Sequence, residues 1–446
     1  MSPDILLSPD ASKASAMRRL RREIFDYALA ECDICNAFAN SIRCGEGILE
    51  VGGSRYDLGG FERIAVISIG KAGHRMAAAL SQLLPVEING IIACSVPPKS
   101  AVVGFRYFYG GHPLPNEDSV RAGKAILDLL HGLPERSLVL FLISGGASAI
   151  AEKPKNSDLT LSDIVEINRV FVHSGAPIAE INAVRKHFSA IKGGRMAEAA
   201  FPAAQLSLLV SDVPDRALDA LASGPTTPDS STVADCYRIA RDYDLIGRFP
   251  KRVRLIFEDE ELSETPKPSD AAFANSRYVT VLSNRSAVEA AMSRAKSLGF
   301  TVETDDSCDD WDYARAADHL LERLRSSRQR SSRVCLVSGG EVTVTVGNES
   351  GVGGRNQQFA LYCADKIAGE SIAVLSAGTD GIDGNSPAAG AMVDGTTRAR
   401  ATQHGLDIAS AISQFDAFPL LDAIGDALVT GPTGNNVRDL RILLAY

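Results

Sequence analysis

Short apolar runs recur along the chain, and segments with apolar residues at helical spacing separate most of them. Six of the runs are long enough for buried strands: 64–69, 138–143, 206–210, 278–282, 334–337 and 372–375. Runs of this length that contain β-branched residues are typical of strands buried on both faces. Strands that alternate with helices form right-handed βαβ units, so we expect an α/β fold with mostly parallel sheets flanked by helices.

A polar or glycine-rich cluster follows each predicted strand. The six clusters are GKAG at 70–73, SGG at 144–146, SDV at 211–213, SNR at 283–285, SGGE at 338–341 and SAGTDG at 376–381. In open α/β sheets, ligands bind beyond the carboxyl ends of the strands. We therefore expect the clusters to share one edge, where they surround one large polar ligand or two ligands.

The alternation of strands and helices is interrupted between residues 249 and 274. This stretch contains the acidic run EDEELSE, followed by Pro266 and Pro268, which disrupt regular structure. A chain of 446 residues is long enough for two or three domains. We predict an N-terminal α/β domain at 1–265 and a C-terminal α/β domain at 266–446.

Composition excludes several classes of protein. The net charge is -9 and no basic stripe dominates, which argues against nucleic acid as a partner; the short run MRRLRR at 17–22 is expected to be a solvated helix face. No apolar stretch is long enough to span a bilayer, and the N-terminus lacks the pattern of a secretory signal. We expect a cytoplasmic protein without a membrane partner. The 8 cysteines are scattered without zinc spacing, so redox or metal roles are not expected for them.

The turn formed by Ser144, Gly145 and Gly146 is a candidate anion site. Its glycines permit a sharp turn and a close approach to a ligand, and a helix start after it offers free N–H groups. A tight strand-to-helix connection without a ligand is the alternative. Lys71 stands at a predicted helix start, where the helix dipole disfavours a cation. It is either a surface lysine or a cation that reaches a phosphate or carboxylate.

Residues 182–195, NAVRKHFSAIKGGR, gather basic side chains around a pair of glycines. Arg185 and Lys192 are candidate anion-binding residues, and a basic, solvent-facing helix is the alternative. His187 has no acidic partner in register and is expected to pack in the interior. His112 lies in a loop flanked by prolines, where a structural role and substrate binding are equally compatible with the sequence.

Acidic and glycine-rich segments complete the candidate chemistry. Asp212 directly follows an apolar strand, so metal binding or general base catalysis are natural roles. The segment 351–357, GVGGRNQ, combines backbone N–H groups with the guanidinium of Arg355, which suits a phosphate. Asp380 and Asp383 in GTDGIDG offer oxygen ligands for Mg²⁺, although the segment lacks the closing glutamate of an EF-hand loop.

These motifs together resemble the glycerate 2-kinase family, whose C-terminal half is called the MOFRL domain. GKAG, GGHPLPN, LISGGASA, INAVRKHFSAIKGGR, SDVP followed by ASGPT, SGGE, GGRNQ, GTDGIDG and TGPTGNN run in family order from about residue 64 to residue 439. The resemblance implies an ATP-dependent kinase that phosphorylates the 2-hydroxyl of D-glycerate with the help of Mg²⁺. It also implies two domains with Rossmann-like sheets and an active site in the cleft between them.

The resemblance carries roles onto particular residues. Lys71, Asp212 and Arg355 match positions regarded as catalytic: the two cations would stabilise the transferring phosphoryl group, and Asp212 would hold Mg²⁺ or accept the hydroxyl proton. Asp380 and Asp383 are expected as further metal ligands. Which glycine turn binds ATP and which binds the substrate stays open. The residues expected to bind one or the other are Ser144, Gly145, Gly146, Arg185, Lys192, Asn284, Gly339, Gly340, Glu341, Gly354, Asn356 and Gln357.

Other functions are weighed against this one. Asp215 stands where relatives typically have Gly and Asn435 where they often have Thr, so the substrate could be a related small hydroxy acid. A hydroxypyruvate reductase, a label that relatives have carried, needs G-x-G-x-x-G with a later acidic residue, and neither GKAG nor GVGGRN has this spacing. A non-catalytic sensor would be expected to lose the charged residues at the strand ends. A homo-oligomer remains compatible with the sequence.

Overall fold

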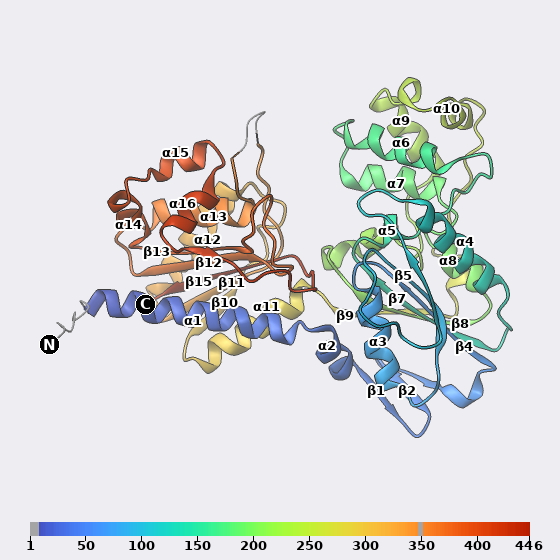
Figure 1. Cartoon of the computed structure of the whole chain (residues 1–446), viewed down its shortest axis with the longest axis horizontal. Coiled ribbons are helices and arrows are strands. Elements are labelled where there is room, and N and C mark those ends of the chain that lie inside the picture. The colour runs from blue at the N-terminus through green and yellow to red at the C-terminus, as the bar shows by residue number, and fades with distance from the viewer. Residues whose placement is uncertain (1–8, 347–350) are drawn as a thin grey trace. The chain divides into compact units, whose positions relative to one another are not determined.

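The protein is described by a computed structural model that covers residues 9–346 and 351–446, without the side chains of residues 9–15, 215 and 216 (Figure 1). Residues 1–8, at the N-terminus where no secretory signal is expected, lie outside the described part, as does the side chain of Asp215. The chain divides into two compact units, Ile34–Val281 and Met1–Asp33 with Leu282–Tyr446. We call them the central unit and the terminal unit. No helix in the described part is both long enough and apolar enough to cross a membrane.

The central unit is built on a six-stranded sheet with the order β6-β5-β4-β7-β8-β9. Its strands are β4 (Arg63–Ile69), β5 (Asn89–Cys94), β6 (Phe105–Tyr109), β7 (Ser137–Ser144), β8 (Ala204–Val210) and β9 (Ser276–Leu282). Pairing is parallel from β6 through β8. The chain leaves β4 for β5 and β6 on one side and then returns to pair β7 on the other side. A topological switch point therefore lies between β4 and β7.

Helices cover both faces of this sheet, because right-handed crossovers on the two sides of a switch point place their helices on opposite faces. Ile67 and Phe141 pack with α4 and α8, whereas α3 contacts β4, β5 and β7. A second apolar core joins α6, α7, α9 and α10, which lie together at the top of Figure 1. The helices are α2 (Ile34–Ser41), α3 (Gly73–Leu83), α4 (Glu117–His131), α5 (Ala147–Ile150), α6 (Leu161–Val172), α7 (Ile178–Phe188), α8 (Arg195–Ala200), α9 (Val233–Asp242) and α10 (Lys251–Glu258). A small antiparallel sheet comprises β1 (Ile42–Gly45), β2 (Ile48–Val51) and β3 (Ser54–Asp57).

The terminal unit contains another six-stranded sheet, with the order β10-β11-β15-β12-β13-β14. Its strands are β10 (Thr301–Thr304), β11 (Val334–Ser338), β12 (Ile372–Gly378), β13 (Gly390–Asp394), β14 (Ala427–Leu428) and β15 (Asp439–Ala445). β10 and β11 are parallel, but β15 runs antiparallel between β11 and β12, and β13 and β14 continue antiparallel. The start of β15 therefore lies beside the ends of β11 and β12.

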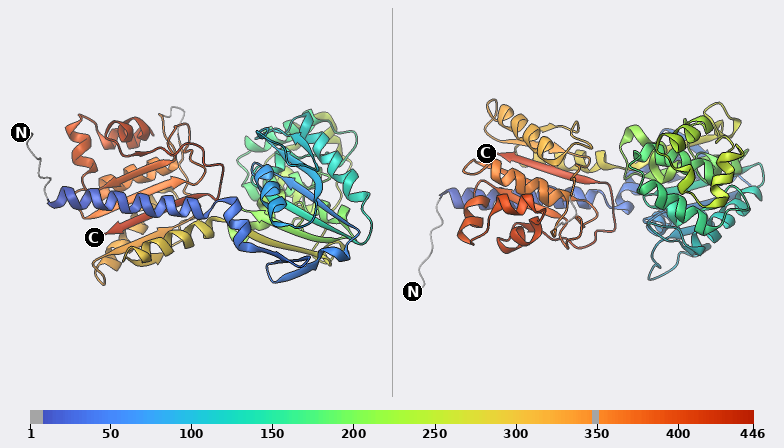
Figure 2. Two further views of the ribbon diagram at one scale, coloured as in Figure 1. Left: turned by 60° about the horizontal axis from the view of Figure 1, so that its bottom comes forward. Right: turned by 90° about the horizontal axis from the view of Figure 1, so that it is seen from above.

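Side-chain alternation divides the two faces of the terminal sheet. Leu336 and Val374 pack in a core with α12, α13, α15 and α16, whereas Val337 and Leu375 pack with α1 and α11. Figure 2 shows α1 running along the sheet of this unit. The helices are α1 (Pro9–Glu31), α11 (Asn284–Ser297), α12 (Tyr313–Arg328), α13 (Arg355–Lys366), α14 (Thr397–Gln403), α15 (Ile408–Ser413) and α16 (Ala417–Ala423).

The α/β fold with two domains is confirmed, and all six predicted strands form. The expectation of mostly parallel sheets is correct for the central unit and wrong for the terminal unit. In the terminal sheet, β15 pairs antiparallel with both β11 and β12, and β13 and β14 also pair antiparallel. Because the six predicted strands belong to two different sheets, the polar clusters do not share one edge.

The structural boundaries also differ from the predicted domains 1–265 and 266–446. The compact units separate after Val281, because β9 completes the central sheet, and α1 packs with the terminal unit. Arg18 pairs with Asp426 at 2.6 Å, and Arg21 is fully buried. The expected solvated face at 17–22 is therefore wrong for Arg21, which donates to the carbonyl oxygen of Val393.

Candidate functional site

The switch point of the central sheet brings two polar turns together. Lys71 follows β4 by two residues, and Ser144 ends the neighbouring strand β7. The N–H of Lys71 donates to the carbonyl oxygen of Gly145 across 2.9 Å, and the N–H of Ala72 donates to Ser144 Oγ across 3.1 Å. A Cβ on Gly70, whose φ is +124°, would lie 2.3 Å from Ser144 Oγ. Only glycine allows the two turns to approach this closely.

The two glycines after Ser144 are surrounded by candidate catalytic side chains. A Cβ on Gly145 would lie 1.9 Å from Asp212 Oδ2. A Cβ on Gly146, whose φ is +81°, would lie 3.0 Å from His112 Cδ2 and 3.1 Å from Lys71 Cγ. Within the described part of the chain, the N–H groups of both glycines donate to no acceptor. Lys71, Asp212 and the turn thus form one polar cluster with open hydrogen-bond donors.

A cavity of about 500 Å³ opens beside this cluster. Arg185 and Lys192 line it together with Gly146 and His112. Its remaining lining residues come from the loop before α4, from α5 and from α6: Pro113, Leu114, Pro115, Ser148, Ala149, Asn168, Arg169, Val172 and His173. The structure therefore brings the predicted residues 71, 144–146, 185, 192 and 212 into one region of the central unit.

The two predicted basic residues of this cavity differ in their partners. Lys192 is buried and ion-paired with Glu152, whose other oxygen accepts from Ser189 Oγ at 2.6 Å. Arg185 forms no hydrogen bond or ion pair with any residue in the described ranges, and its Nε is buried. Burial lowers the pKa of Arg185, with Glu152 opposing this shift through its charge. A half-buried guanidinium that lacks a partner among the described residues is costly, and an anionic ligand would remove this cost.

Sequence reasoning left His112 undecided and missed other residues of the cavity. Burial, and secondarily the charge of Lys71, lowers the pKa of His112, which favours the neutral imidazole. Asn168 and His173 carry no recognisable motif, and only their place in the cavity lining reveals them; Glu152, also without a motif, is revealed by its ion pair with Lys192. His187 is buried, as expected, and its Nδ1 lies 2.7 Å from the carbonyl oxygen of Ala183.

The terminal unit holds the other predicted residues, around the start of α13. Arg355, the first residue of α13, donates through Nε to Asp439 Oδ2 and through Nη2 to Glu341 Oε1, both across 2.6 Å. Burial opposes the charge of Arg355, but the hydrogen bonds and charge of Asp439, together with the charge of Glu341, outweigh it and raise its pKa. Unlike Arg185, this guanidinium already has two carboxylate partners.

Asp383 caps the N-terminus of α13. One carboxylate oxygen accepts from the N–H of Asn356 at 3.1 Å, and the other accepts from the N–H and the Nε2 of Gln357 at 2.8 and 2.9 Å. Burial raises the pKa of Asp383 to about 6, although these N–H groups favour the carboxylate. These contacts explain the positions of Asn356 and Gln357 without a ligand.

The second SGG turn differs from the first in its hydrogen bonds. The N–H groups of Gly339, Gly340 and Glu341 donate to Asp306 at 2.8 Å, to Asn284 at 2.8 Å and to Asp309 at 3.0 Å. Asn284 also donates to two carbonyl oxygens at 437 and 439. Side chains of the protein therefore already occupy the donors that were expected to hold a nucleotide or substrate.

A cavity of about 680 Å³ lies in front of α13. Gly354, Arg355, Asp380 and Asp383 line it, together with Gln358 and residues of the neighbouring loops. Asp380 Oδ1 accepts from the N–H of Ile382 at 3.1 Å. The structure thus gathers residues 354, 355, 380 and 383 around one cavity of the terminal unit.

Two protein-family models match the chain. A domain of unknown function, DUF4147, matches residues 20–258, and the MOFRL family matches residues 334–439. These ranges include the polar cluster of the central unit and the surroundings of α13 in the terminal unit.

Named relatives cover nearly the whole chain. Glycerate 2-kinase of Pyrococcus horikoshii is 32% identical over 438 residues, which is 97% of this chain and 98% of that protein. A putative hydroxypyruvate reductase of Agrobacterium vitis is 35% identical over 96% of this chain and 94% of that protein. The crystal structure of glycerate kinase from Thermotoga maritima matches with a TM-score of 0.84 at 32% identity, covering 97% of this chain and 100% of that one.

Proposed function

The chain belongs to the glycerate 2-kinase family, and we propose that it transfers the γ-phosphoryl group of ATP to the 2-hydroxyl of D-glycerate. The hydroxyl oxygen bonds to the γ-phosphorus, the bond from this phosphorus to the bridging oxygen breaks, and ADP and 2-phosphoglycerate leave. Such a transfer depends on positioning and charge neutralisation more than on covalent chemistry. The observation that carries the proposal is the guanidinium of Arg185, which has no partner among the described residues and lines the cavity beside the Lys71 and Asp212 cluster.

We assign the substrate carboxylate to Arg185. A carboxylate would satisfy the buried guanidinium with charge-assisted hydrogen bonds, which are the strong class of hydrogen bond in proteins. Lys192 is less suited to this role, because Glu152 already neutralises it. We therefore assign Lys192 a structural role in the lining of the cavity, where Glu152 neutralises its charge.

We assign the phosphoryl group to the first SGG turn. The open N–H groups of Gly145 and Gly146 and the exposed amine of Lys71 would stabilise charge on the transferring group. Asp212 packs against Gly145 and would accept the proton of the 2-hydroxyl. Ser144 positions this turn by accepting the hydrogen bond of Ala72.

In the terminal unit we propose that Arg355 stabilises the phosphoryl group and that Gly354 lines the nucleotide cavity. Asn284, Gly339 and Gly340 hold the second SGG turn through internal hydrogen bonds, so we assign them a positioning role. Glu341 orients Arg355 across 2.6 Å. Asp383 caps the start of α13 through Asn356 and Gln357, and we assign these three residues to positioning the helix start that carries Arg355.

Magnesium ion bound to ATP would neutralise phosphate charge. Asp380 and Asp383 both line the cavity of the terminal unit, and we favour Asp380 as a ligand because both oxygens of Asp383 are already taken up in capping α13. Asp212 remains a proposed ligand in the central unit. We place the reaction in the cytoplasm, where Mg²⁺ and ATP are available, and a homo-oligomer is compatible with it.

A kinase assay across three- and four-carbon hydroxy acids tests the proposed function. D-Glycerate should support ATP-dependent turnover, and phosphorus NMR should place the new phosphate on the 2-oxygen. A 3-phosphate product, or preferred turnover of a four-carbon acid, would contradict the proposed substrate assignment. Omission of ATP serves as the control.

Hydroxypyruvate reduction is the second candidate, because one relative carries that name. A dinucleotide site of this kind places an acidic residue at the end of the strand beside the glycine turn. Here β5 lies beside β4 and ends at Cys94, which Ser95 and Val96 follow, so the acidic residue of a dinucleotide site is missing from this strand end. Oxidation of NADH by hydroxypyruvate without ATP would favour the reductase, whereas its absence alongside kinase turnover would exclude it as the main activity.

A further inference from the structure

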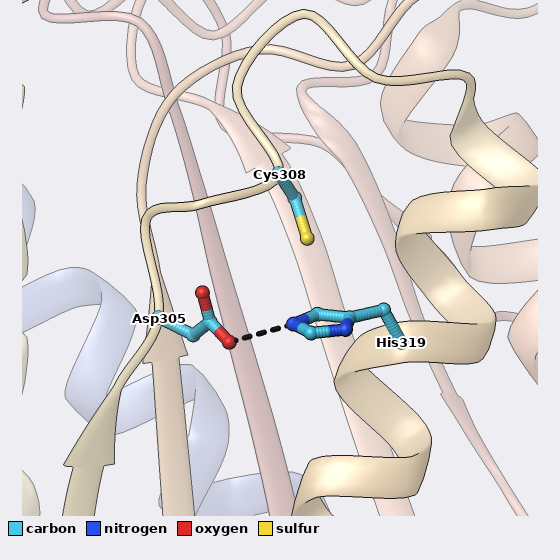
Figure 3. A group of neighbouring side chains, drawn as sticks. All are labelled: Asp305, Cys308 and His319. Atoms are coloured by element: carbon cyan, nitrogen blue, oxygen red, sulfur yellow. Dashed lines mark hydrogen bonds and ion pairs between the residues drawn. The ribbon is translucent and has the colours of Figure 1, made fainter.

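Three potential metal-binding side chains converge in the terminal unit, away from the residues assigned above (Figure 3). Asp305 directly follows β10, Cys308 lies three residues later in the same loop, and His319 lies on α12. One ligand atom from each residue lies within 4.8 Å of the others, and His319 Nε2 is 2.8 Å from Asp305 Oδ2. Figure 3 shows the Cys308 sulfur pointing toward the imidazole and the carboxylate. Among the described residues, no other group of His, Cys, Asp and Glu side chains is gathered in this way.

We propose that Asp305, Cys308 and His319 bind a divalent transition metal of the zinc class. Zinc prefers cysteine sulfur, histidine nitrogen and carboxylate oxygen in a tetrahedral arrangement, with a water molecule as the fourth ligand where the protein supplies three. A thiolate, a carboxylate and a neutral imidazole together carry two negative charges, which match the charge of the ion. Binding therefore displaces the proton of the Cys308 thiol to solvent.

Neighbouring groups orient two of the three ligands. Asp305 Oδ1 accepts from the N–H and the Oγ of Ser307 at 3.0 and 2.6 Å, which directs Oδ2 toward His319. Trp311 packs against the imidazole of His319 with a centroid separation of 5.3 Å. Such contacts fix ligand orientation in metal sites.

Arg323 would compete with a metal ion for Asp305 Oδ2. Its Nη1 donates to Asp305 Oδ2 across 2.6 Å, and its Nη2 lies 3.5 Å from Glu303 Oε2. A metal that takes Oδ2 leaves Arg323 paired with Glu303. The imidazole of His319 is 35% exposed and borders a cavity of about 280 Å³, which gives the ion an entry path and a place for water.

The loop that carries two of the ligands also holds the second SGG turn. Asp306 accepts from the N–H of Gly339, and Asp309 accepts from the N–H of Glu341. A metal bound to Asp305 and Cys308 would pin this loop at both ends of the segment 305–308. Its first expected effect is therefore on the stability of the terminal unit, and metal binding is measured without the proposed phosphoryl transfer.

Cobalt titration of the full-length, metal-free protein tests the site. Co²⁺ should bind with a stoichiometry of one, giving a thiolate-to-cobalt charge-transfer band in the near ultraviolet and visible bands typical of tetrahedral coordination. Cys308→Ala should abolish the charge-transfer band. Cys363→Ala is the matched control, because Cys363 is equally buried in the same apolar core but does not belong to the group of Asp305, Cys308 and His319. This variant should keep the charge-transfer band.

A second variant keeps the test decisive if Cys308→Ala fails to fold. His319→Gln changes a partly exposed side chain and should weaken Zn²⁺ affinity by roughly 100-fold or more, since loss of a ligand exceeds the effect of its supporting contacts. Zn²⁺ should also raise the unfolding temperature of the wild type but not of His319→Gln. A missing charge-transfer band in the wild type, or equal Zn²⁺ affinity of wild type and His319→Gln, would overturn the proposal.

Discussion

The backbone N–H of Lys71 donates to the carbonyl oxygen of Gly145 across 2.9 Å, which ties together the turns after β4 and β7. These strands flank the topological switch point, where α/β sheets bind their ligands. The hydrogen bond fixes the backbone of Lys71 but leaves its side chain exposed. Backbone position and side-chain chemistry can therefore be separated experimentally at this residue.

Lys71→Met should lower kcat by about 100-fold to 1,000-fold, because it removes a cation from the charge that develops during transfer. The unfolding temperature should change little, since the side chain has no partner in the described part of the chain. Steady-state kinetics and thermal unfolding check the two expectations. Lys99→Met, at another exposed lysine of the same unit, is the control and should retain wild-type kcat.

Gly145→Ala tests the contact between the turn and Asp212. The new Cβ would lie 1.9 Å from Asp212 Oδ2, so the carboxylate must move away from its position. If Asp212 accepts the hydroxyl proton, kcat should fall at least about tenfold, because catalytic geometry tolerates little displacement. Gly247→Ala places a Cβ where no atom lies within 4 Å and should leave kcat unchanged. Equal kcat values for the two variants would argue against a role of Asp212.

Arg185→Met should separate substrate binding from stability. Loss of a charged hydrogen bond should raise the KM for D-glycerate by roughly 10-fold to 100-fold. The unfolding temperature should stay constant or rise, because the variant removes a half-buried charge that has no partner among the described residues. Arg169→Met is the matched control: Arg169 lines the same cavity but pairs with Glu166 at 2.7 Å. A KM that rises equally in both variants would contradict the assignment.

The two SGG turns show which features can be predicted from the sequence and which cannot. Both follow apolar strands, and local residues were sufficient to predict the strands and the turns. Their different chemistry arises from distant side chains. Asn284, Asp306 and Asp309 accept the N–H groups of the second turn, whereas the N–H groups of Gly145 and Gly146 have no acceptor among the described residues. The strand directions in the terminal sheet were also not predicted, because they too depend on contacts between distant segments. The last strand pairs between β11 and β12, and apolar periodicity contains no information about its partner.

His187 provides a prediction about stability and pH. Burial lowers its pKa below the ordinary value of 6.5, and its Nε2 has no hydrogen-bond partner among the described residues, although Glu264 lies 3.6 Å away. The unfolded chain therefore takes up a proton at a higher pH than the native protein. The resulting stability is complete above pH 6.5 and is lost as the pH falls toward the native pKa.

Urea unfolding of wild type and His187→Gln at about pH 7.5 and about pH 5.5 measures this contribution. The free energy of unfolding of the wild type should fall more between the two pH values than that of the variant, which lacks the titrating group. Glutamine can keep a hydrogen bond to the carbonyl oxygen of Ala183, so the comparison isolates the proton. Parallel pH dependence of the two proteins would show that His187 titrates alike in the native and unfolded states.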